Sequence, residues 1–234
     1  MSNVQHQWEY LCTQTGKFLF PAYCLGCGAS GTLLCQPCGV TLHHPPTKCL
    51  LCTRPILGGI CRDCAQKTSL ERIDAYAPYR NPLARALVGH MKYQFEYALA
   101  HPIGDVLASI VGSLTPNTLL VPIPLHKKKL RERGFNQSAL IARHIGDTIH
   151  IPVDTSGSFL RTIYTPPQAR TATKKERKEH LKSAFSVIDP HPFFGKHIVL
   201  VDDVITSGAT IREAARALKQ ASPASIRVLA FSYG

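Results

Sequence analysis

The chain has no apolar run that approaches the roughly 20 residues needed for a membrane-spanning helix. Residues 1–20 lack both the basic start and the continuous apolar stretch of an export signal. The sequence also has no loop of the form G-x-x-x-x-G-K-S/T, which accompanies the magnesium strand of many ATPases. We therefore expect a cytoplasmic protein without a membrane span, and ATPase chemistry is a weak alternative.

Acidic residues are scarce. The 234 residues include 15 Asp and Glu against 27 Lys and Arg, a formal net charge of +12. The excess is concentrated in residues 121–182, which hold 13 basic and 5 acidic residues. Such a local excess predicts polyanionic ligands, although a merely solvated basic face would have the same composition.

Cysteine is abundant and regularly placed. Eight of the nine cysteines form four C-x-x-C pairs, namely Cys24/Cys27, Cys35/Cys38, Cys49/Cys52 and Cys61/Cys64. Two thiolates three residues apart form one zinc knuckle, and two knuckles complete a Cys₄ shell. Because the spacings within 24–38 and 49–64 are nearly the same, we pair the knuckles sequentially. The pattern therefore predicts two structural Zn²⁺ sites.

Other uses of these cysteines are less consistent with the sequence. Four disulfides would need an oxidising compartment, and a redox role would need only one reactive dithiol. Cys12 is left over and is expected to pack as a small buried residue. The cysteine-rich segment has too little core to fold alone, so the metals should supply its folding free energy. We place a zinc-binding double zinc-ribbon domain at 1–70 and a second domain at 71–234.

The segment VLVDDVITSGAT, at 199–210, is typical of a sugar-phosphate site. Residues 199–201 suit a buried parallel strand, which places Asp202 and Asp203 at its C-terminal end, where open α/β sheets bind ligands. The two carboxylates can accept hydrogen bonds from vicinal hydroxyls. A phosphate loop follows, which consists of Thr206, Ser207, Gly208, Ala209 and Thr210. An ordinary strand, turn and helix with Thr and Ser caps is the alternative.

Strands and helices alternate after residue 70, which predicts an α/β fold with a mainly parallel sheet flanked by helices. The expected strands are 76–79, 119–123, 159–163, 185–188, 197–202 and 226–231. The expected helices are 83–93, 103–114, 136–149 and one beginning near 210, whose apolar face consists of Ile211, Ala214, Ala215 and Leu218.

Two basic segments are candidates for anion binding. Residues 122–138 leave a buried strand with Lys127, Lys128, Lys129, Arg131 and Arg133, and enter a helix after Gly134. Residues 161–185 are polar, proline-punctuated and basic, as expected of a lid over an anionic substrate. A solvated helix with paired Glu and Lys side chains is the alternative for the second segment.

Residues 199–210 resemble the phosphoribosyl pyrophosphate (PRPP) signature of the type I phosphoribosyltransferases along all twelve positions. The resemblance implies that Asp202 and Asp203 are the catalytic pair and hold the ribose 2- and 3-hydroxyls. It implies that residues 206–210 hold the 5-phosphate. Mg²⁺ bound with PRPP would bridge the hydroxyls and the pyrophosphate.

Nearly the whole chain resembles the ComF/GntX-like family of competence proteins, which join a zinc ribbon to a phosphoribosyltransferase domain. The resemblance rests on the cysteine knuckles, on YRNPLARALVGHMKY, on VPIP followed by RERGFNQ and on the signature at 199–210. It also includes pyrophosphate, lid or DNA residues, namely Lys92, Arg131, Arg133, Arg161, Gln168 and Arg177. His180 departs from the family pattern, in which asparagine is common.

The resemblance implies a role in natural transformation, in which the protein handles single-stranded DNA after DNA uptake. Aromatic residues that can stack on bases lie among the basic residues, namely Tyr93, Phe95, Tyr97, Phe135 and Tyr164. Core packing is the alternative for about half of them. An active Mg²⁺-dependent transferase with an unknown acceptor is the second functional reading. A third reading treats the zinc segment as a docking module for a DNA helicase or another competence protein.

Overall fold

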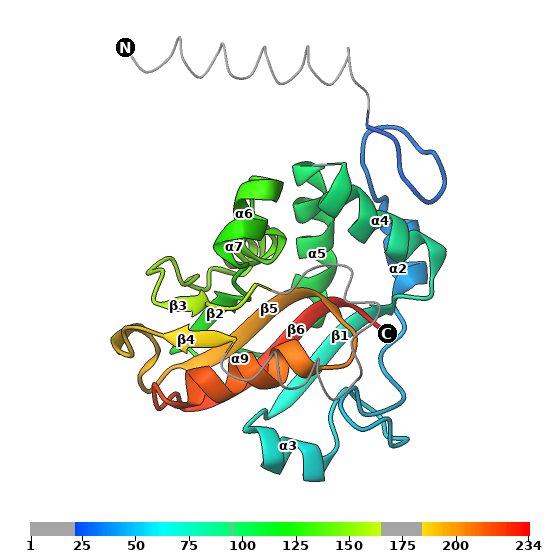
Figure 1. The fold of residues 1–234 in the computed structure, drawn as a ribbon. Coiled ribbons are helices and arrows are strands. Elements are labelled where there is room, and N and C mark those ends of the chain that lie inside the picture. Colours follow the sequence, from blue (N-terminus) through cyan, green and yellow to red (C-terminus); the bar gives the residue numbers. More distant parts are fainter. Residues whose placement is uncertain (1–21, 95, 165–183) are drawn as a thin grey trace, which may run out of the picture.

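The computed structural model describes residues 22–94, 96–164 and 184–234. Its centre is a four-stranded parallel sheet in the order β1-β6-β5-β2 (Figure 1). The strands are β1 (Arg72–Pro78), β2 (Thr118–Pro122), β5 (His197–Ile205) and β6 (Ser225–Tyr233). A two-stranded antiparallel sheet pairs β3 (Phe159–Arg161) with β4 (Phe185–Val187). The predicted parallel α/β fold is therefore confirmed.

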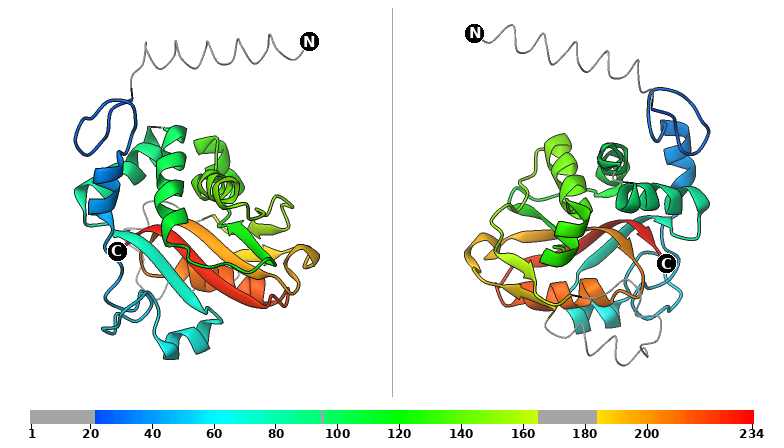
Figure 2. Two further views of the ribbon diagram at one scale, coloured as in Figure 1. Left: turned by 180° about the vertical axis from the view of Figure 1, so that it is seen from behind. Right: turned by 45° about the horizontal axis from the view of Figure 1, so that its top comes forward.

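Helices cover both faces of the parallel sheet (Figure 2). The α-helices are α2 (Gln36–Leu42), α3 (Arg62–Thr68), α4 (Pro82–Tyr93), α5 (Ala100–Ile110), α6 (Lys127–Arg133), α7 (Gln137–Ile149) and α9 (Ala209–Lys219). Two 3₁₀ helices are η1 (Tyr97–Leu99) and η2 (His191–Phe193). None of the described helices has both the length and the apolar character needed to cross a membrane.

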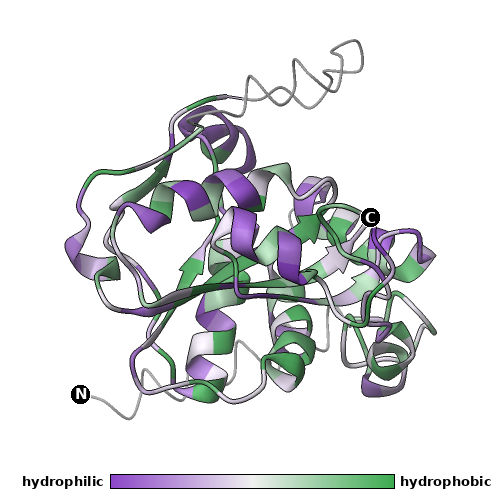
Figure 3. Ribbon diagram, turned by 90° about the horizontal axis from the view of Figure 1, so that it is seen from below, coloured by the Kyte–Doolittle hydropathy of each residue, from purple (hydrophilic) through white to green (hydrophobic). Residues whose placement is uncertain are grey.

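The sheet separates two apolar cores because successive side chains of a strand point to opposite faces. In β5, Ile198 and Leu200 pack with α9, whereas Val199 and Val201 pack with α4, α5 and α7. Figure 3 shows the corresponding pattern, in which helices carry both hydrophilic and hydrophobic segments. The predicted apolar face of α9 is confirmed, since all four of its residues are buried. Strands buried on both faces explain the nearly continuous apolar runs in the sequence.

Several boundaries differ from those expected. Strand β1 begins at Arg72 rather than near Tyr76, because its backbone pairs with β6 from Arg72↔Arg227 onward. Strand β5 continues past Asp202 to Ile205, where it still pairs with β6. The basic segment after β2 contains a helix that the sequence did not predict. Gly134, with φ of +76°, ends this helix α6 in a left-handed conformation that favours glycine.

The two cysteine modules, residues 24–38 and 49–64, lie on opposite faces of the sheet. Leu34 of the first module is buried in the core beneath α4 and α5. Leu50 of the second module is buried in the core beneath α9. Figure 1 shows the same arrangement, with α2 near α4 and α3 near α9. The boundary at residue 70 stays a prediction, and each module shares apolar contacts with the sheet.

Candidate functional site

The two predicted carboxylates lie in β5 immediately beyond the end of β2, whose last pairing is Pro122↔Val201. Asp202 and Asp203 are 9% and 8% exposed. The Ser138 hydroxyl donates a 3.2 Å hydrogen bond to Asp202 Oδ1, and the Asp203 backbone N–H donates a 3.0 Å bond to the same oxygen. The site is therefore a pair of nearly buried carboxylates at the ligand-binding edge of the sheet.

The electrostatics of the two carboxylates differ. Burial, followed by the adjacent charge of Asp203, raises the pKa of Asp202 to about 7. Asp203 instead has an ion pair, because Lys92 Nζ lies 2.7 Å from its Oδ2. Burial by itself would lower the pKa of Lys92, but the charge of Asp203 and the hydrogen bond to it outweigh burial, so the pKa of Lys92 is raised. Lys92 thus neutralises one carboxylate and leaves the other readily protonated.

A cavity of about 450 Å³ opens in front of the carboxylates. It is lined by residues of α4, α6, α7, β3, β5 and α9 and of the loops after β2 and β5, namely Lys92, Tyr93, Ile123, Leu125, Lys129, Arg133, Gln137, Ser138, Arg161, Asp202, Asp203, Val204, Thr206 and Thr210. Burial, followed by the charges of Arg161 and Arg133, lowers the pKa of Lys129. Cations crowded into one partly buried wall favour an anionic ligand.

The predicted phosphate loop connects β5 to α9. Thr206 and Thr210 both line the cavity. Gly208 is the N-cap residue of α9, with φ of +67°, and no side chain caps this helix end. The first backbone N–H groups of a helix lack partners within the helix and favour an anion. The loop can therefore bind a phosphate beside the two carboxylates.

The cavity collects some of the predicted residues and not others. Lys92, Arg133 and Arg161 line it. Arg131 does not line it, because its position on α6 leaves it exposed. Gln168 and Arg177 lie outside the described residues, as do Cys12, Phe95 and His180.

Two polar residues of the cavity, Gln137 and Ser138, had no role of their own in the sequence analysis. Ser138 holds Asp202, and Gln137 is 2% exposed with its Nε2 lacking a hydrogen-bond partner among the described residues. Both occupy the first turn of α7, which is capped by Asn136 through a 3.1 Å bond from Ser138 N–H. The sequence signal for this position was Asn136 before a helix with apolar periodicity, because an Asn in that place predicts a helix start and so puts Gln137 and Ser138 in the first turn.

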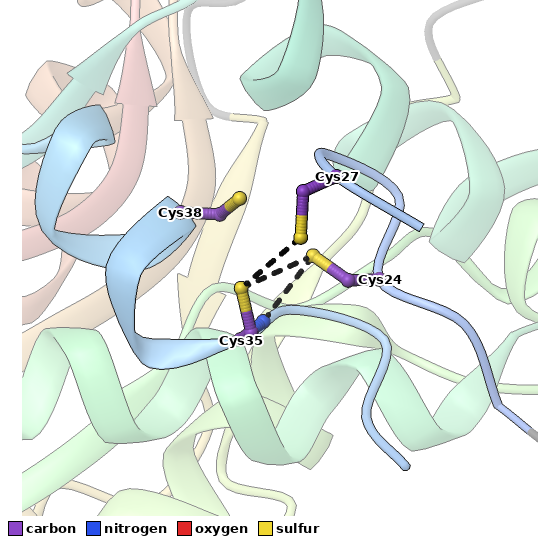
Figure 4. Close-up of side chains that lie close together, drawn as sticks. All are labelled: Cys24, Cys27, Cys35 and Cys38. Carbon is purple, nitrogen blue, oxygen red and sulfur yellow. Dashed lines mark hydrogen bonds between the residues drawn. The ribbon is translucent and has the colours of Figure 1, made fainter. Parts of the chain in front are cut away.

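The cysteines gather as two groups of four, in the predicted sequential pairing. Within each group, all sulfur atoms lie within 4.8 Å of one another. Figure 4 shows the first group, in which a loop supplies Cys24 and Cys27 and the start of α2 supplies Cys35 and Cys38. The sulfur of Cys35 is 3.6 Å from that of Cys24 and 3.5 Å from that of Cys27. All eight cysteines are free.

These groups fit a tetrahedral metal ion. Zinc with Zn–S bonds of about 2.3 Å places its sulfur ligands roughly 3.8 Å apart, close to the observed separations. Backbone N–H groups of Gly26 and Cys35 donate to Cys24 Sγ at 3.4 and 3.3 Å. Burial opposes ionisation, but such donors lower the pKa of Cys24 to about 6. Cys61 N–H donates to Cys49 Sγ in the same way at 3.4 Å, and the pKa of Cys49 is also lowered to about 6.

The candidate stacking aromatics separate into two kinds. Phe135 is 9% exposed and packs in the core, with Tyr97 edge-on at 4.5 Å. Tyr93 is 72% exposed at the rim of the cavity. Tyr164 is half-buried, and Lys128 Nζ lies 4.6 Å from its ring centroid. Tyr93 and Tyr164 are therefore available beside the cationic wall, whereas Phe135 is structural.

Comparison with known proteins gives consistent results. Residues 166–233 match the phosphoribosyl transferase domain family. The chain is 30% identical to the DNA utilization protein YhgH of Escherichia coli K12, over 92% of this chain and 84% of that protein. It is 26% identical to competence protein F of Haemophilus influenzae, covering 83% and 82% of the two chains. It is 27% identical to competence protein ComFC of Bacillus subtilis, covering 76% and 73%.

Proposed function

The chain belongs to the ComF/GntX-like family of competence and DNA-utilization proteins, and on this premise we propose that it handles internalised single-stranded DNA during natural transformation. We propose that it does so on a phosphoribosyltransferase-type scaffold that binds PRPP. The main support for PRPP binding is that one cavity of about 450 Å³ is lined by two buried carboxylates, by the loop at 206–210 and by the cations Lys129, Arg133 and Arg161.

In the proposed PRPP complex, each part of the cavity binds one part of the ligand. The ribose 2- and 3-hydroxyls donate hydrogen bonds to Asp202 and Asp203, and the 5-phosphate accepts from the backbone at 206–210. Lys92 occupies one oxygen of Asp203, and the other can accept a hydroxyl. At the pyrophosphate, Lys129, Arg133 and Arg161 provide positive charge. Mg²⁺ bound with PRPP would neutralise part of the pyrophosphate charge.

Calorimetric titration of PRPP with Mg²⁺ tests this site. We expect wild type to bind and Asp202→Asn/Asp203→Asn to lose binding, because an amide cannot replace a carboxylate as a charged acceptor for both hydroxyls. Arg131→Ala is the matched control, since Arg131 is a cation outside the cavity. No binding by folded, zinc-loaded wild type would reject PRPP as the ligand and leave the signature as scaffold.

Single-stranded DNA binding is supported by the positive wall and by the two available aromatics. Stacking on an aromatic ring contributes on the order of 1–3 kcal/mol per base, and phosphate contacts make affinity fall with salt. We expect an oligonucleotide to bind at low ionic strength, with weaker binding for Tyr93→Ala and Lys128→Ala. Fluorescence anisotropy across a salt series measures this. An affinity that is absent, or that does not change with salt, would contradict the proposal.

Transfer of the phosphoribosyl group from PRPP to an amine or base is the second candidate function. The observation that favours it is the carboxylate pair, which can stabilise positive charge developing at the ribose as pyrophosphate leaves. Cations of the wall would hold the departing pyrophosphate. A pyrophosphate-release assay over a panel of nucleobases and amines tests turnover. Release that requires both an acceptor and intact Asp202 would establish it, and its absence across the panel would reject it for those acceptors.

We further propose that both cysteine groups hold structural Zn²⁺ and that the protein acts in the cytoplasm. A DNA helicase or another competence protein is the proposed partner of the zinc-binding segment. Pull-down with the full chain and with a variant altered on the exposed face of α2, which continues past the end of the first module, tests the partner; the variant is Val40→Asp. Val40 is 61% exposed, so the substitution should leave folding intact. Identical partners for both proteins would exclude this face.

A further inference from the structure

We infer that the second cysteine module positions the phosphate loop, and that Leu51, in the knuckle between Cys49 and Cys52, is the positioning residue. The inference rests on the proposed binding of the PRPP phosphate by residues 206–210. It assigns to the second metal site a role in ligand affinity, in addition to its contribution to folding.

The contact between the module and the loop is direct. Gly208 is buried even though Thr206 and Ser207 beside it are exposed. A β-carbon added at Gly208 would overlap Cδ2 of Leu51 and would lie 3.3 Å from the backbone oxygen of Leu50. Gly208 also has φ of +67°, a conformation that favours glycine. The module therefore covers the turn of the loop so closely that no side chain fits between them.

The knuckle is itself fixed to the sheet. Leu50 N–H donates a 2.9 Å hydrogen bond to Gly59 O within the module. A β-carbon added at Gly59 would overlap the backbone oxygen of Ile73 in β1, so the module lies directly on the first strand. Leu50 is 5% exposed and packs in the same core as Ile211 of α9. A continuous set of contacts thus runs from β1 through the knuckle to the N-terminus of α9.

The metal closes this set of contacts. The Sγ atoms of Cys52 and Cys61 lie 3.7 Å apart, so one bound ion would join the knuckle that carries Leu51 to the segment before α3. Without the ion, the four sulfur atoms have no shared ligand, and the knuckle loses its fixed position. Leu51 would then cease to hold Gly208 in the left-handed conformation that directs the backbone N–H groups of the loop. Zinc loading of the second module should therefore control phosphate affinity.

The first module provides a built-in control. Gly26 occupies the position in its knuckle that Leu51 occupies in the second. A β-carbon at Gly26 would lie 2.8 Å from Cys38 Sγ and 2.8 Å from Leu83 Cδ2, so this knuckle faces its own cysteine group and α4. Leu25 packs against the core on the other face of the sheet. Truncating Leu25 should leave the phosphate loop unchanged.

The experiment compares wild type, Leu51→Ala and the matched control Leu25→Ala as full-length, zinc-loaded proteins. Zinc content, amide deuterium exchange at residues 206–212 and calorimetric affinity for PRPP with Mg²⁺ are measured for each. In Leu51→Ala we expect two zinc ions per chain, faster exchange in the loop and an affinity about five-fold weaker. In Leu25→Ala, exchange in the loop and affinity should equal those of wild type. If Leu51→Ala loses zinc, the smaller truncation Leu51→Val, with zinc retained, replaces it.

The outcomes separate this inference from the proposed function. Failure of wild type to bind PRPP rejects the proposed ligand, and loop exchange alone then decides whether Leu51 positions the loop. Unchanged loop exchange in a zinc-loaded Leu51 variant overturns the inference, whether or not PRPP binds. An equal increase in Leu25→Ala also overturns it, because the effect would then be a general loss of stability.

Discussion

The two cysteine modules have the same ligand pattern but touch different parts of the protein. The module at 24–38 packs with α4 and α5, and just after it Gly39 O of α2 accepts a 3.0 Å hydrogen bond from Tyr76 Oη of β1. The module at 49–64 lies over the loop that joins β5 to α9. Both groups of sulfur atoms have the same compact geometry. A repeated motif therefore specifies a repeated group of four cysteines, while the surface against which each module packs differs.

The largest expected effect comes from removing each metal site in turn. We expect Cys52→Ser/Cys61→Ser and Cys27→Ser/Cys35→Ser each to lose one of two zinc ions, because the two remaining thiolates of a group cannot complete the tetrahedral shell. Only the first of these variants should also lose PRPP affinity, by about ten-fold or more. Elemental analysis and calorimetry measure the two quantities. Circular dichroism checks that the variants remain folded. Equal losses of PRPP affinity in the two variants would contradict the claim that only the second module affects ligand binding.

A pH series measures the contribution of Asp202, one of the two carboxylates of the cavity. Burial raises the pKa of Asp202 to about 7, above the roughly 3.9 of an unfolded aspartate. Between these values the folded chain binds a proton that the unfolded chain has lost. The free energy of unfolding should therefore fall as pH rises from about 4 through 7.

Asp202→Asn removes this titration. Because one pKa unit corresponds to about 1.4 kcal/mol, we expect the variant to be more stable than wild type at pH 8 by on the order of 1–3 kcal/mol. The two proteins should be similar near pH 4. Urea denaturation at both pH values measures the difference, with the exposed Asp147→Asn as control. A stability difference that is independent of pH would contradict the assigned cause.

The smallest expected effect concerns the contact between Gly208 and Leu51 of the second module. Gly208→Ala should cost about 1–2 kcal/mol, because an L-residue is strained at φ of +67° and its β-carbon overlaps Leu51. Leu51→Ala removes the overlap but not the backbone strain. The cost of Gly208→Ala should therefore be smaller in the Leu51→Ala background, as a double-mutant cycle on denaturation free energies would measure. Additive costs would show that the two residues do not interact.

Much of the fold and part of the site could be predicted from local patterns. The strand, the two carboxylates and the small loop at 199–210 follow one another along the chain, so their arrangement could be predicted without knowing the tertiary structure. The C-x-x-C spacing likewise predicted two groups of four cysteines, which the structure confirms. Helix α6 escaped prediction because a run of Lys and Arg has no apolar periodicity, although Gly134 marked its end.

Contacts between distant segments could not be predicted in the same way. Ser138 and Lys92 reach the carboxylates from α7 and α4, across long separations along the chain. Arg131 and Arg133 looked equivalent in the sequence, yet only Arg133 lines the cavity, because the orientation of α6 decides which side chain points inward.

The sequence by itself determined the residue types of the candidate sites: the cysteine groups, the carboxylate pair, the small loop at 206–210 and the excess of positive charge. These depend on residue types and short spacings, which survive in any fold that keeps the strand and the knuckles. Only the tertiary structure decided which groups act together. Packing against opposite faces of one sheet placed one cysteine module over α4 and the other over Gly208, and no pattern within either module encodes that choice.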